Sequence, residues 1–280
     1  MSLPKTLSEH AEEQAFKRFE KDGWEEAAGP YHQGFAAITP QAAQALVRQA
    51  GVSAGQRVLD VATGPGYAAA AAALRGAQVL GIDIAEAVLA LARKEYPGLE
   101  LRLGDAEALE LPDGAFDAVL MNFVLMHLAD PDKALREAFR VLKPGGRAAF
   151  AVWHRPQEAV AFSLVLAAVK AHGNPAVPLP AGPDFFRFAD LDESRRSLAQ
   201  AGFSQAHSEV FPQYWRFSEP DTVFQTLLNG TVRTGALLRA QEPAALRRIQ
   251  EALRQELAKY RVGEEYLLPM PAVLGVGVKP

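Results

Sequence analysis

The stretch VLDVATGPGYAAA, Val58 to Ala70, limits the folds open to this chain more than any other part of its sequence. A run of apolar and β-branched residues stops at an acid and at two glycines around a proline, and an alanine-rich segment follows. The run predicts a buried strand, the glycines predict a tight turn, and the alanines predict a helix. A turn between a strand and a helix commonly holds a ligand against its backbone.

The same rhythm of strand and helix continues through the next part of the chain. Apolar runs predict strands at 57–62, 77–84, 99–106 and 115–126, and the KPGG turn at 143–146 leads into a fifth strand at 147–153. Helical patterns separate them at 66–74, 86–95 and 130–142. Strands that alternate with helices predict a parallel sheet with helices on both faces, the doubly wound α/β fold.

The pattern changes after about residue 155. Helical patterns at 160–172, 221–238 and 243–260 surround a proline-rich joint and aromatic residues, and two late strands are predicted at 208–217 and 272–279. Such a region is typical of a cap near the carboxyl ends of a sheet. We therefore expect one core domain with a small cap, which fits a length of 280 residues.

Composition narrows the functional classes. The chain has no cysteine, which excludes disulfides and a cysteine nucleophile, and a net charge of −4 without a long basic cluster argues against nucleic acid as a partner. No apolar run approaches the roughly 18 residues of a transmembrane helix, and no secretory signal is evident. We expect a cytoplasmic protein without membrane or metal binding; its oligomeric state is not readable.

Gly64 and Gly66 allow a ligand to approach the backbone closely at the end of the first strand. With Ala69 they also satisfy the loose dinucleotide fingerprint G-x-G-x-x-G/A, and Asp83 at the end of the second strand suits a ribose in a dinucleotide or a nucleoside. An aspartate there is also a common N-cap for the following helix. These residues alone leave an NAD(P)-dependent dehydrogenase open.

Three further motifs separate the alternatives: DVATGPGY, GIDIAEAVLALAR, and the long segment from GDAEALELPDGAFDAVLMNF to LKPGGRAAFAVW. In this order they resemble the class I S-adenosylmethionine-dependent methyltransferases, in particular the quinone-biosynthesis-like branch that acts on small molecules. The resemblance covers 24–153 well and the C-terminal half loosely. It implies a seven-stranded Rossmann-like sheet with six parallel strands and one antiparallel strand.

The resemblance also implies how the chain is divided. Residues 1–40 would form a helical lid over the cofactor, residues 41–154 the cofactor-binding core, and residues 155–280 the substrate cap with the last two strands of the sheet. The cofactor would be S-adenosyl-L-methionine, with S-adenosyl-L-homocysteine as product. The partner would be a small-molecule acceptor.

By the same resemblance, Asp83 would accept both ribose hydroxyls and Asp105 the exocyclic amine of adenine. The glycine turn would lie against the methionine part, and Tyr31 would belong to the lid. The complete set of expected cofactor contacts is Tyr31, Asp60, Ala62, Gly64, Gly66, Asp83, Ile84, Asp105, Ala106 and Asn122.

Methyl transfer from a sulfonium is an in-line displacement, so the protein mainly aligns the reactants and excludes water. An acceptor hydroxyl or acidic carbon also benefits from a general base, and His127 and His154, just after the fourth and fifth strands, are the candidates by position. A histidine at either place also serves as pocket packing. Aromatic residues of the cap, with Phe186, Tyr214 and Trp215 as the selected candidates, would contact a flat or lipophilic acceptor.

The sequence therefore predicts an enzyme that methylates an oxygen or carbon of a small aromatic or lipophilic molecule. Two alternatives stay open: a protein that binds S-adenosylmethionine without transferring its methyl group, and the dehydrogenase. A metal-dependent variant would need a group of acids near the fourth strand, where Met121, Asn122 and Phe123 stand.

Overall fold

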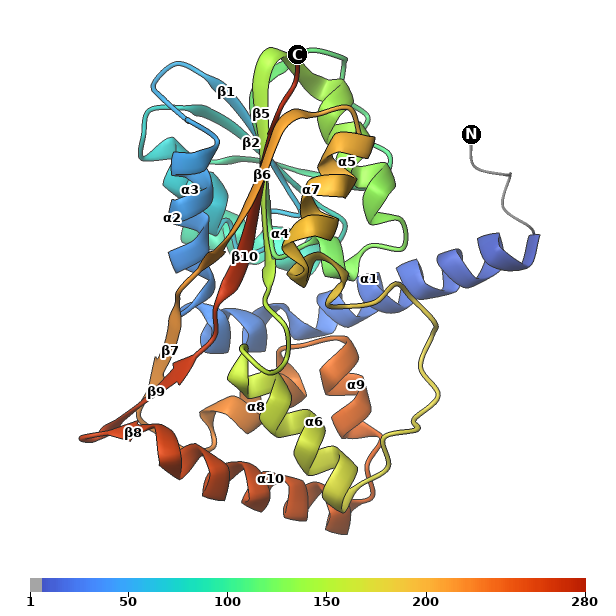
Figure 1. Cartoon of the computed structure of the whole chain (residues 1–280), viewed down its shortest axis with the longest axis vertical. Coiled ribbons are helices and arrows are strands. Elements are labelled where there is room, and N and C mark those ends of the chain that lie inside the picture. Colours follow the sequence, from blue (N-terminus) through green and yellow to red (C-terminus); the bar gives the residue numbers. More distant parts are fainter. Residues whose placement is uncertain (1–6) are drawn as a thin grey trace.

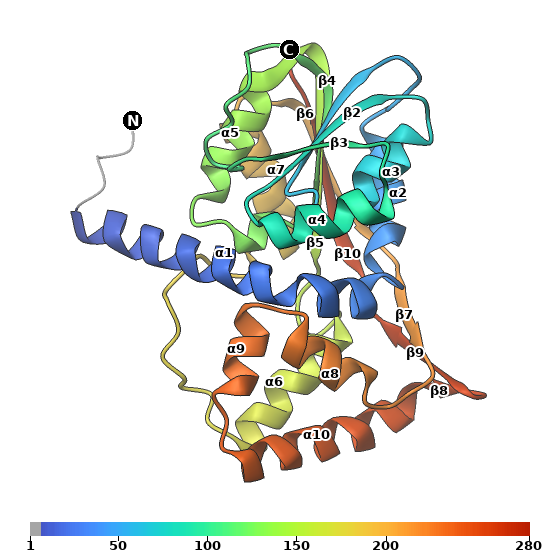
Figure 2. The ribbon, with the colours of Figure 1, turned by 180° about the vertical axis from the view of Figure 1, so that it is seen from behind.

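The structure, a computed structural model, describes residues 7–280, and the side chains from residue 10 onward. A sheet with helices on both sides forms the upper half of the molecule in Figure 1, and a group of helices forms the lower half. The long helix α1 (Leu7–Phe35) runs between the two halves, and the view from behind in Figure 2 agrees.

The central sheet has seven strands in the order β3-β2-β1-β4-β5-β10-β6. Neighbours from β3 to β5 pair in parallel, whereas β10 is antiparallel to both β5 and β6. The predicted sheet of six parallel strands and one antiparallel strand is therefore confirmed. Its strands are β1 (Arg57–Val61), β2 (Gln78–Asp83), β3 (Glu100–Leu103), β4 (Phe116–Asn122), β5 (Leu142–Trp153), β6 (Ser204–Phe211) and β10 (Ala272–Val278).

Helices cover both faces of the sheet, with α2 and α3 on one side and α5 and α7 on the other (Figures 1 and 2). The middle strands have few polar residues because both of their faces are buried: Leu59, Leu120 and Phe150 are fully inaccessible to solvent. The covering helices are α2 (Thr39–Gln49), α3 (Tyr67–Ala73), α4 (Glu86–Glu95), α5 (Pro131–Val141) and α7 (Leu191–Gln200).

The cap contains four helices and a small antiparallel sheet in the order β7-β9-β8. Its helices are α6 (Val160–His172), α8 (Thr222–Asn229), α9 (Arg233–Arg239) and α10 (Pro243–Leu257), and its strands are β7 (Tyr214–Phe217), β8 (Arg261–Val262) and β9 (Glu265–Pro269). Three short 3₁₀ turns complete the described elements: η1 (Leu125–His127), η2 (Arg187–Ala189) and η3 (Ala258–Tyr260).

Four predicted elements differ from those observed. The strand expected at 115–126 ends at Asn122, because Phe123 takes a left-handed φ of 60° and turns the chain into η1. The expected KPGG turn lies inside the continuous strand β5, where Gly145 and Gly146 pair with Lys279. The helix expected at 221–238 breaks near Gly230, and the strand expected at 208–217 is two strands, β6 and β7, in different sheets.

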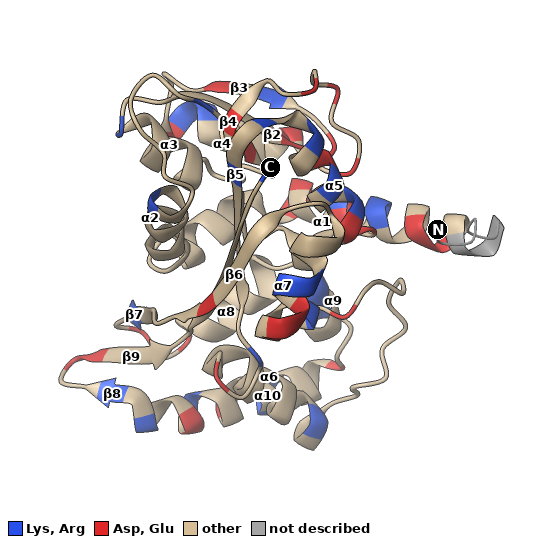
Figure 3. Cartoon of the chain, turned by 45° about the horizontal axis from the view of Figure 1, so that its top comes forward, with Lys and Arg blue, Asp and Glu red and all other residues tan. Residues whose placement is uncertain are grey.

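Basic and acidic residues are interspersed on the surface. Figure 3 shows both signs of charge on α1, α5 and α7. Many of them pair: Arg187 after the cap's proline-rich joint contacts both Asp132 of α5 and Glu193 of α7. Within the described residues, no helix has the length and apolar character needed to cross a membrane.

Candidate active site

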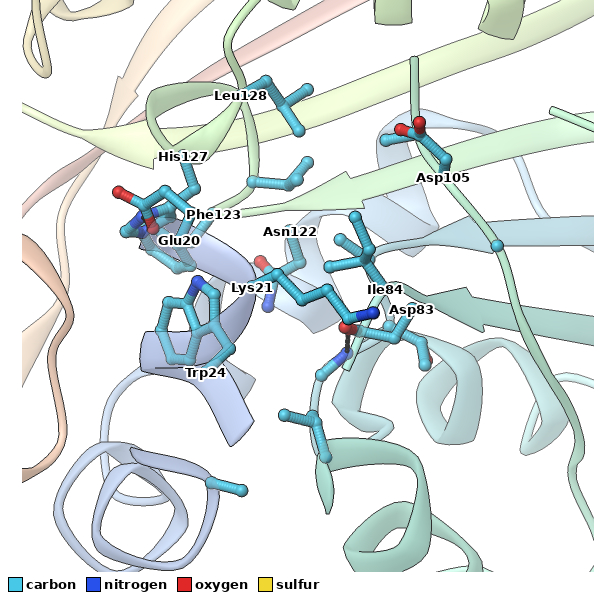
Figure 4. A pocket seen from close by; sticks show the side chains of 18 of the residues that line it. Glu20, Lys21, Trp24, Asp83, Ile84, Asp105, Asn122, Phe123, His127 and Leu128 are labelled. Carbon is cyan, nitrogen blue, oxygen red and sulfur yellow. Dashed lines mark hydrogen bonds and ion pairs between the residues drawn. The ribbon is translucent and has the colours of Figure 1, made fainter. Parts of the chain in front are cut away.

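A cavity opens at the carboxyl ends of β1, β2 and β4 and beside the loop after β3, where α1 covers it. This is the place where doubly wound sheets hold their ligands. Figure 4 shows Asp83, Ile84 and Asp105 at one end, and Glu20, Trp24, Phe123 and His127 at the other. The lining residues are Lys17, Glu20, Lys21, Trp24, Ala28, Tyr31, Ala62, Thr63, Gly64, Pro65, Tyr67, Asp83, Ile84, Val88, Gly104, Asp105, Ala106, Glu107, Asn122, Phe123, Val124, His127 and Leu128.

The glycine turn after β1 depends on backbone conformations that favour glycine. Gly64 has φ +57° and Gly66 has φ +90°. Gly64 faces the cavity, and an added Cβ would have Ala62 O, at 4.0 Å, as its nearest protein neighbour. A Cβ added at Gly66 would come within 3.0 Å of the Tyr96 ring. Gly64 therefore leaves room for a ligand, and Gly66 lets the turn pack on the protein.

Asp60 stabilises this turn from behind. The side chain is fully buried, and its Oδ2 accepts hydrogen bonds from Thr63 Oγ1 at 2.7 Å and from the Ala69 amide at 2.8 Å. Its Oδ1 has no hydrogen-bond partner among the described residues. Burial, only partly offset by those two bonds, raises the pKa of Asp60 to about 7.

Asp83 at the end of β2 presents its carboxylate to the cavity. The Gly64 amide donates to Oδ2 at 2.9 Å and the Ala85 amide donates to Oδ1 at 3.1 Å. Each oxygen keeps a lone pair for a further donor. Burial raises the pKa of Asp83 above its ordinary value, and the backbone donors oppose that shift.

Asp105, after β3, is tied to the covering helix. Lys17 of α1 forms an ion pair with Asp105 and contacts Glu107 at 3.3 Å. Glu107 also accepts from the amides of Ala129 and Asp130 and so connects this loop to the chain after η1. A ligand that uses the Asp105 carboxylate would have to share it with Lys17 or displace that side chain.

Two residues without a glycine's freedom also take left-handed conformations at the cavity. Ala62 has φ +51° at the end of β1, and Phe123 has φ +60° at the end of β4. Such backbone strain concentrates at functional sites. Beside them, Asn122 donates through Nδ2 to Thr39 O at 3.4 Å, and its buried Oδ1 has no partner among the described residues.

His127 lies at the opposite end of the cavity from Asp83. Its Nδ1 is 3.0 Å from Glu20 Oε2, and its ring meets Trp24 and Phe185 edge to face at centroid distances of 5.0 and 5.5 Å. Tyr31, also on α1, packs against Trp24, and burial raises its pKa to about 12. The tyrosine therefore keeps its proton at neutral pH.

The sequence is similar to known proteins. A family profile described as "Methyltransferase domain" matches residues 59–150. A demethylmenaquinone methyltransferase of Renibacterium salmoninarum is 32% identical over 168 residues, which cover 57% of this chain and 71% of that protein. The chain belongs to the S-adenosylmethionine-dependent methyltransferases. The match decides against the dehydrogenase alternative.

Other relatives of the methyltransferase align over a shorter region. A ubiquinone biosynthesis O-methyltransferase of Pseudomonas fluorescens is 41% identical over 118 residues, 40% of this chain and 50% of that protein. A solved phosphoethanolamine N-methyltransferase of Haemonchus contortus, in complex with S-adenosylhomocysteine, covers 99% of this chain and 61% of its own, with 20% identity and a TM-score of 0.57. At that identity the similarity shows the fold.

The residues of the methyltransferase cavity fit the family's cofactor. S-adenosylmethionine has a ribose diol, an adenine amine and an amino-acid end without phosphates, so it needs acceptors and close backbone more than a phosphate clamp. Asp83 offers two carboxylate oxygens with free lone pairs, Gly64 leaves room in front of the turn, and Asn122 Oδ1 is a buried acceptor with no partner in the described part of the chain. These three residues would hold the ribose and the amino-acid end.

The expected site residues are only partly brought together. Eight of the ten predicted cofactor contacts line the cavity: Tyr31, Ala62, Gly64, Asp83, Ile84, Asp105, Ala106 and Asn122. Asp60 and Gly66 lie behind them in the glycine turn, and their contact with the cofactor stays a prediction. His127 lines the cavity, whereas His154 does not; its Nδ1 accepts from the Arg155 amide at 2.7 Å.

The three selected cap residues are not among those that line the cavity, and their contact with the acceptor stays a prediction. Trp215 is buried and stacks on Phe35 at 5.3 Å. Phe186 packs on Phe162, and Tyr214 is 46% exposed while its carbonyl accepts from Gln41.

The sequence did not predict most of the residues that α1 contributes to the lining of the cavity. Lys17, Glu20 or Lys21, Trp24, Ala28 and Tyr31 recur every three or four residues, which places them on one face of the helix, and that face covers the cavity. The spacing of these residues is visible in the sequence. They are a mixture of charged and apolar residues, however, and such a mixture does not indicate a helix face that packs on a core. Within the described residues, no group of three or more histidines and acids is arranged to hold a metal ion.

Proposed function

We propose that this methyltransferase transfers the methyl group of S-adenosylmethionine to an oxygen or ring carbon of a reduced quinone, with His127 as the proton acceptor. The relatives named for demethylmenaquinone and for ubiquinone biosynthesis both point to this class of acceptor. A quinol is flat and carries phenolic hydroxyls, one of which must lose its proton as the nucleophile forms.

One observation carries the proposal: a single cavity joins acceptors for a nucleoside to an aromatic end with a histidine. Trp24 and Phe123 supply apolar surface there, and His127 supplies the base. An acceptor at this end would lie beside the methionine part of a cofactor anchored on Asp83. Burial under α1 would exclude water from the reaction.

When bound, S-adenosylmethionine supplies the methyl group, and its carbon–sulfur bond breaks with the electron pair left on sulfur. His127 takes the hydroxyl proton of the quinol on Nε2, and the electron pair of that O–H bond remains on the acceptor. The new bond forms at oxygen or at the activated ring carbon. In the second case the ring carbon loses its proton and the quinol oxygen regains one, so one proton is released in either case. The chain thus aligns the two molecules and accepts one proton.

The proposal is tested with S-adenosylmethionine and two acceptors, 2-prenyl-1,4-naphthoquinol and a prenylated catechol, kept reduced. Mass spectrometry should find a methylated product from one of them and an equal amount of S-adenosylhomocysteine. A His127→Ala variant should still bind the cofactor and lose about 10²-fold or more in turnover. Binding of the cofactor with no methylated product from either acceptor would contradict the proposal.

A further inference from the structure

We infer that Glu20 is a positioning residue for catalysis: it holds His127 in the tautomer that can accept a proton, and it does so only while α1 covers the cavity. This inference rests on the proposed function of His127. Glu20 and His127 are 107 residues apart in sequence, and they meet because α1 crosses the carboxyl end of β4.

Both side chains of the Glu20–His127 pair are shielded from solvent. The Glu20 side chain is 5% exposed and that of His127 is 15% exposed. One Glu20 oxygen lies 3.0 Å from His127 Nδ1, and the other has no hydrogen-bond partner among the described residues. Burial of a carboxylate that has a single hydrogen-bond partner costs free energy. We therefore infer that this pair does more than hold a helix in place.

The contact fixes the proton on one ring nitrogen. A carboxylate only accepts hydrogen bonds, so the nitrogen that faces Glu20 carries the proton, and Nε2 keeps its lone pair. No hydrogen bond to Nε2 is formed within residues 10–280. When Nε2 takes a proton from the acceptor, the same carboxylate stabilises the imidazolium that forms.

The ring cannot easily turn away from this orientation. Trp24 of the same helix and Phe185 of the cap meet it edge to face, at interplanar angles of 82° and 84°. A movement of α1 away from the sheet would remove both Glu20 and Trp24 from the ring. Closure of α1 and readiness of the base are thereby one event.

Other contacts already attach α1 to the core. Glu25 accepts from the amides of Glu86 and Ala87, both at 2.8 Å, at the start of α4, and His32 contacts Tyr67 at 2.8 Å. Glu25 therefore gives a matched control: it is a carboxylate on the same helix that attaches the helix without touching His127.

Several other charged groups surround the His127 region. They are Lys17 and Lys21 on α1, Glu107 after β3, Asp132 on α5, Arg187 on η2 and Arg233 on α9. Lys17 is paired with Asp105 and Glu107, and Arg187 with Asp132 and Glu193. Among the side chains that the structure describes, Glu20 is within hydrogen-bond distance of the imidazole, whereas Glu107 and Asp132 form no hydrogen bond with it.

The test compares Glu20→Gln with Glu25→Gln over a range of pH, with 2-prenyl-1,4-naphthoquinol as acceptor. A glutamine amide can donate to Nδ1 and so permits the unproductive tautomer. Glu20→Gln should lower kcat by at least about tenfold with little change in cofactor affinity, and should move the acid limb of the kcat profile to lower pH. Glu25→Gln should weaken cofactor binding and leave the acid limb of the kcat profile at its wild-type pH.

Two further measurements separate a positioning role from simple attachment of the helix. The double variant Glu20→Gln/His127→Ala should be no slower than His127→Ala, because the two residues act as one unit. Imidazole ¹⁵N spectra of the complex with S-adenosylhomocysteine, assigned with His127→Ala, should show Nε2 unprotonated in the wild type and a mixture of tautomers in Glu20→Gln.

The spectra need no turnover, so they test the inference even if the acceptor proposal fails. Equal spectra for the wild type and Glu20→Gln would overturn the inference. Additive losses in the double variant, or the same loss and the same pH profile in both glutamine variants, would also overturn it and leave Glu20 as a structural contact of α1.

Discussion

Asp83 is the residue on which cofactor binding should depend most. Both of its oxygens are held by backbone amides and keep lone pairs that face the cavity. Hydrogen bonds to a charged acceptor contribute about 1.5–3 kcal/mol. We expect Asp83→Ala to weaken S-adenosylmethionine binding by about 10- to 200-fold in a calorimetric titration.

The matched control is Asp113→Ala, which removes an exposed carboxylate that pairs with Arg140 away from the cavity. Its cofactor affinity should equal that of the wild type. Thermal unfolding without ligand checks that the Asp83 variant is folded. Unchanged affinity in Asp83→Ala would place the ribose elsewhere.

Asp60 should make the stability of the fold depend on pH. Its pKa is about 7 in the folded protein, against about 3.9 in an unfolded chain. Between these values the folded state binds the proton more tightly, so the free energy of unfolding should fall as pH rises from about 4 to 7 and then level off. Asp83 adds a contribution of the same sign.

Asp60→Asn should reduce this slope. Both donors, Thr63 and Ala69, bond to the same carboxylate oxygen, so the single oxygen of asparagine can keep both. Urea unfolding at a series of pH values measures the effect. A slope between pH 4 and 7 equal to that of the wild type would show that another group titrates.

At the scale of elements, α1 is the part of the chain on which cofactor retention should depend. Glu25 satisfies two free amides at the start of α4, which lies beside the cavity. Loss of a helix cap costs about 0.5–2 kcal/mol. We expect Glu25→Ala to speed release of S-adenosylhomocysteine several-fold in a stopped-flow experiment.

A parallel change at an exposed acid of α1, Glu26→Ala, should leave the release rate unchanged. If both variants release the product at the wild-type rate, α1 does not control exit from the cavity.

Elements with a strong pattern were predictable from the sequence. The helix expected at 86–95 is α4 residue for residue, because an acid in its first turn, basic residues in its last turn and a following Pro97 mark both ends. The end of β4 was not predictable, because the apolar run continues through Phe123 while the backbone turns left-handed there. Apolar character does not reveal that conformation.

The residues of the candidate site also fall into those that the sequence predicted and those that it did not. Asp83 and Asp105 were predicted as cofactor contacts because each stands where a strand ends, and both line the cavity; their contact with the cofactor stays a prediction. Glu20 was not predicted, because its partner His127 is brought to it by the crossing of α1, which no local pattern encodes. The sheet β7-β9-β8 was also missed, since β8 has two residues and Pro212 and Gln213 separate β7 from β6.

At the scale of the whole molecule, α1 separates the sheet from the cap and faces both. Its inner face covers the cavity, while Phe16 on α1 and Phe185 of the cap both lie under the Arg233 guanidinium of α9. A movement of the cap would therefore reach His127 through Phe185. In the proposed function, this arrangement would bring the acceptor, the cofactor and His127 together beneath α1.

The measurement that tests this account most directly is a crystal structure of the chain with S-adenosylhomocysteine. We predict the ribose on Asp83, the adenine near Asp105 with Lys17 displaced or shared, and the sulfur directed toward Trp24 and His127. A nucleoside bound in the cavity with its sulfur directed away from His127, or bound outside the cavity, would contradict the account.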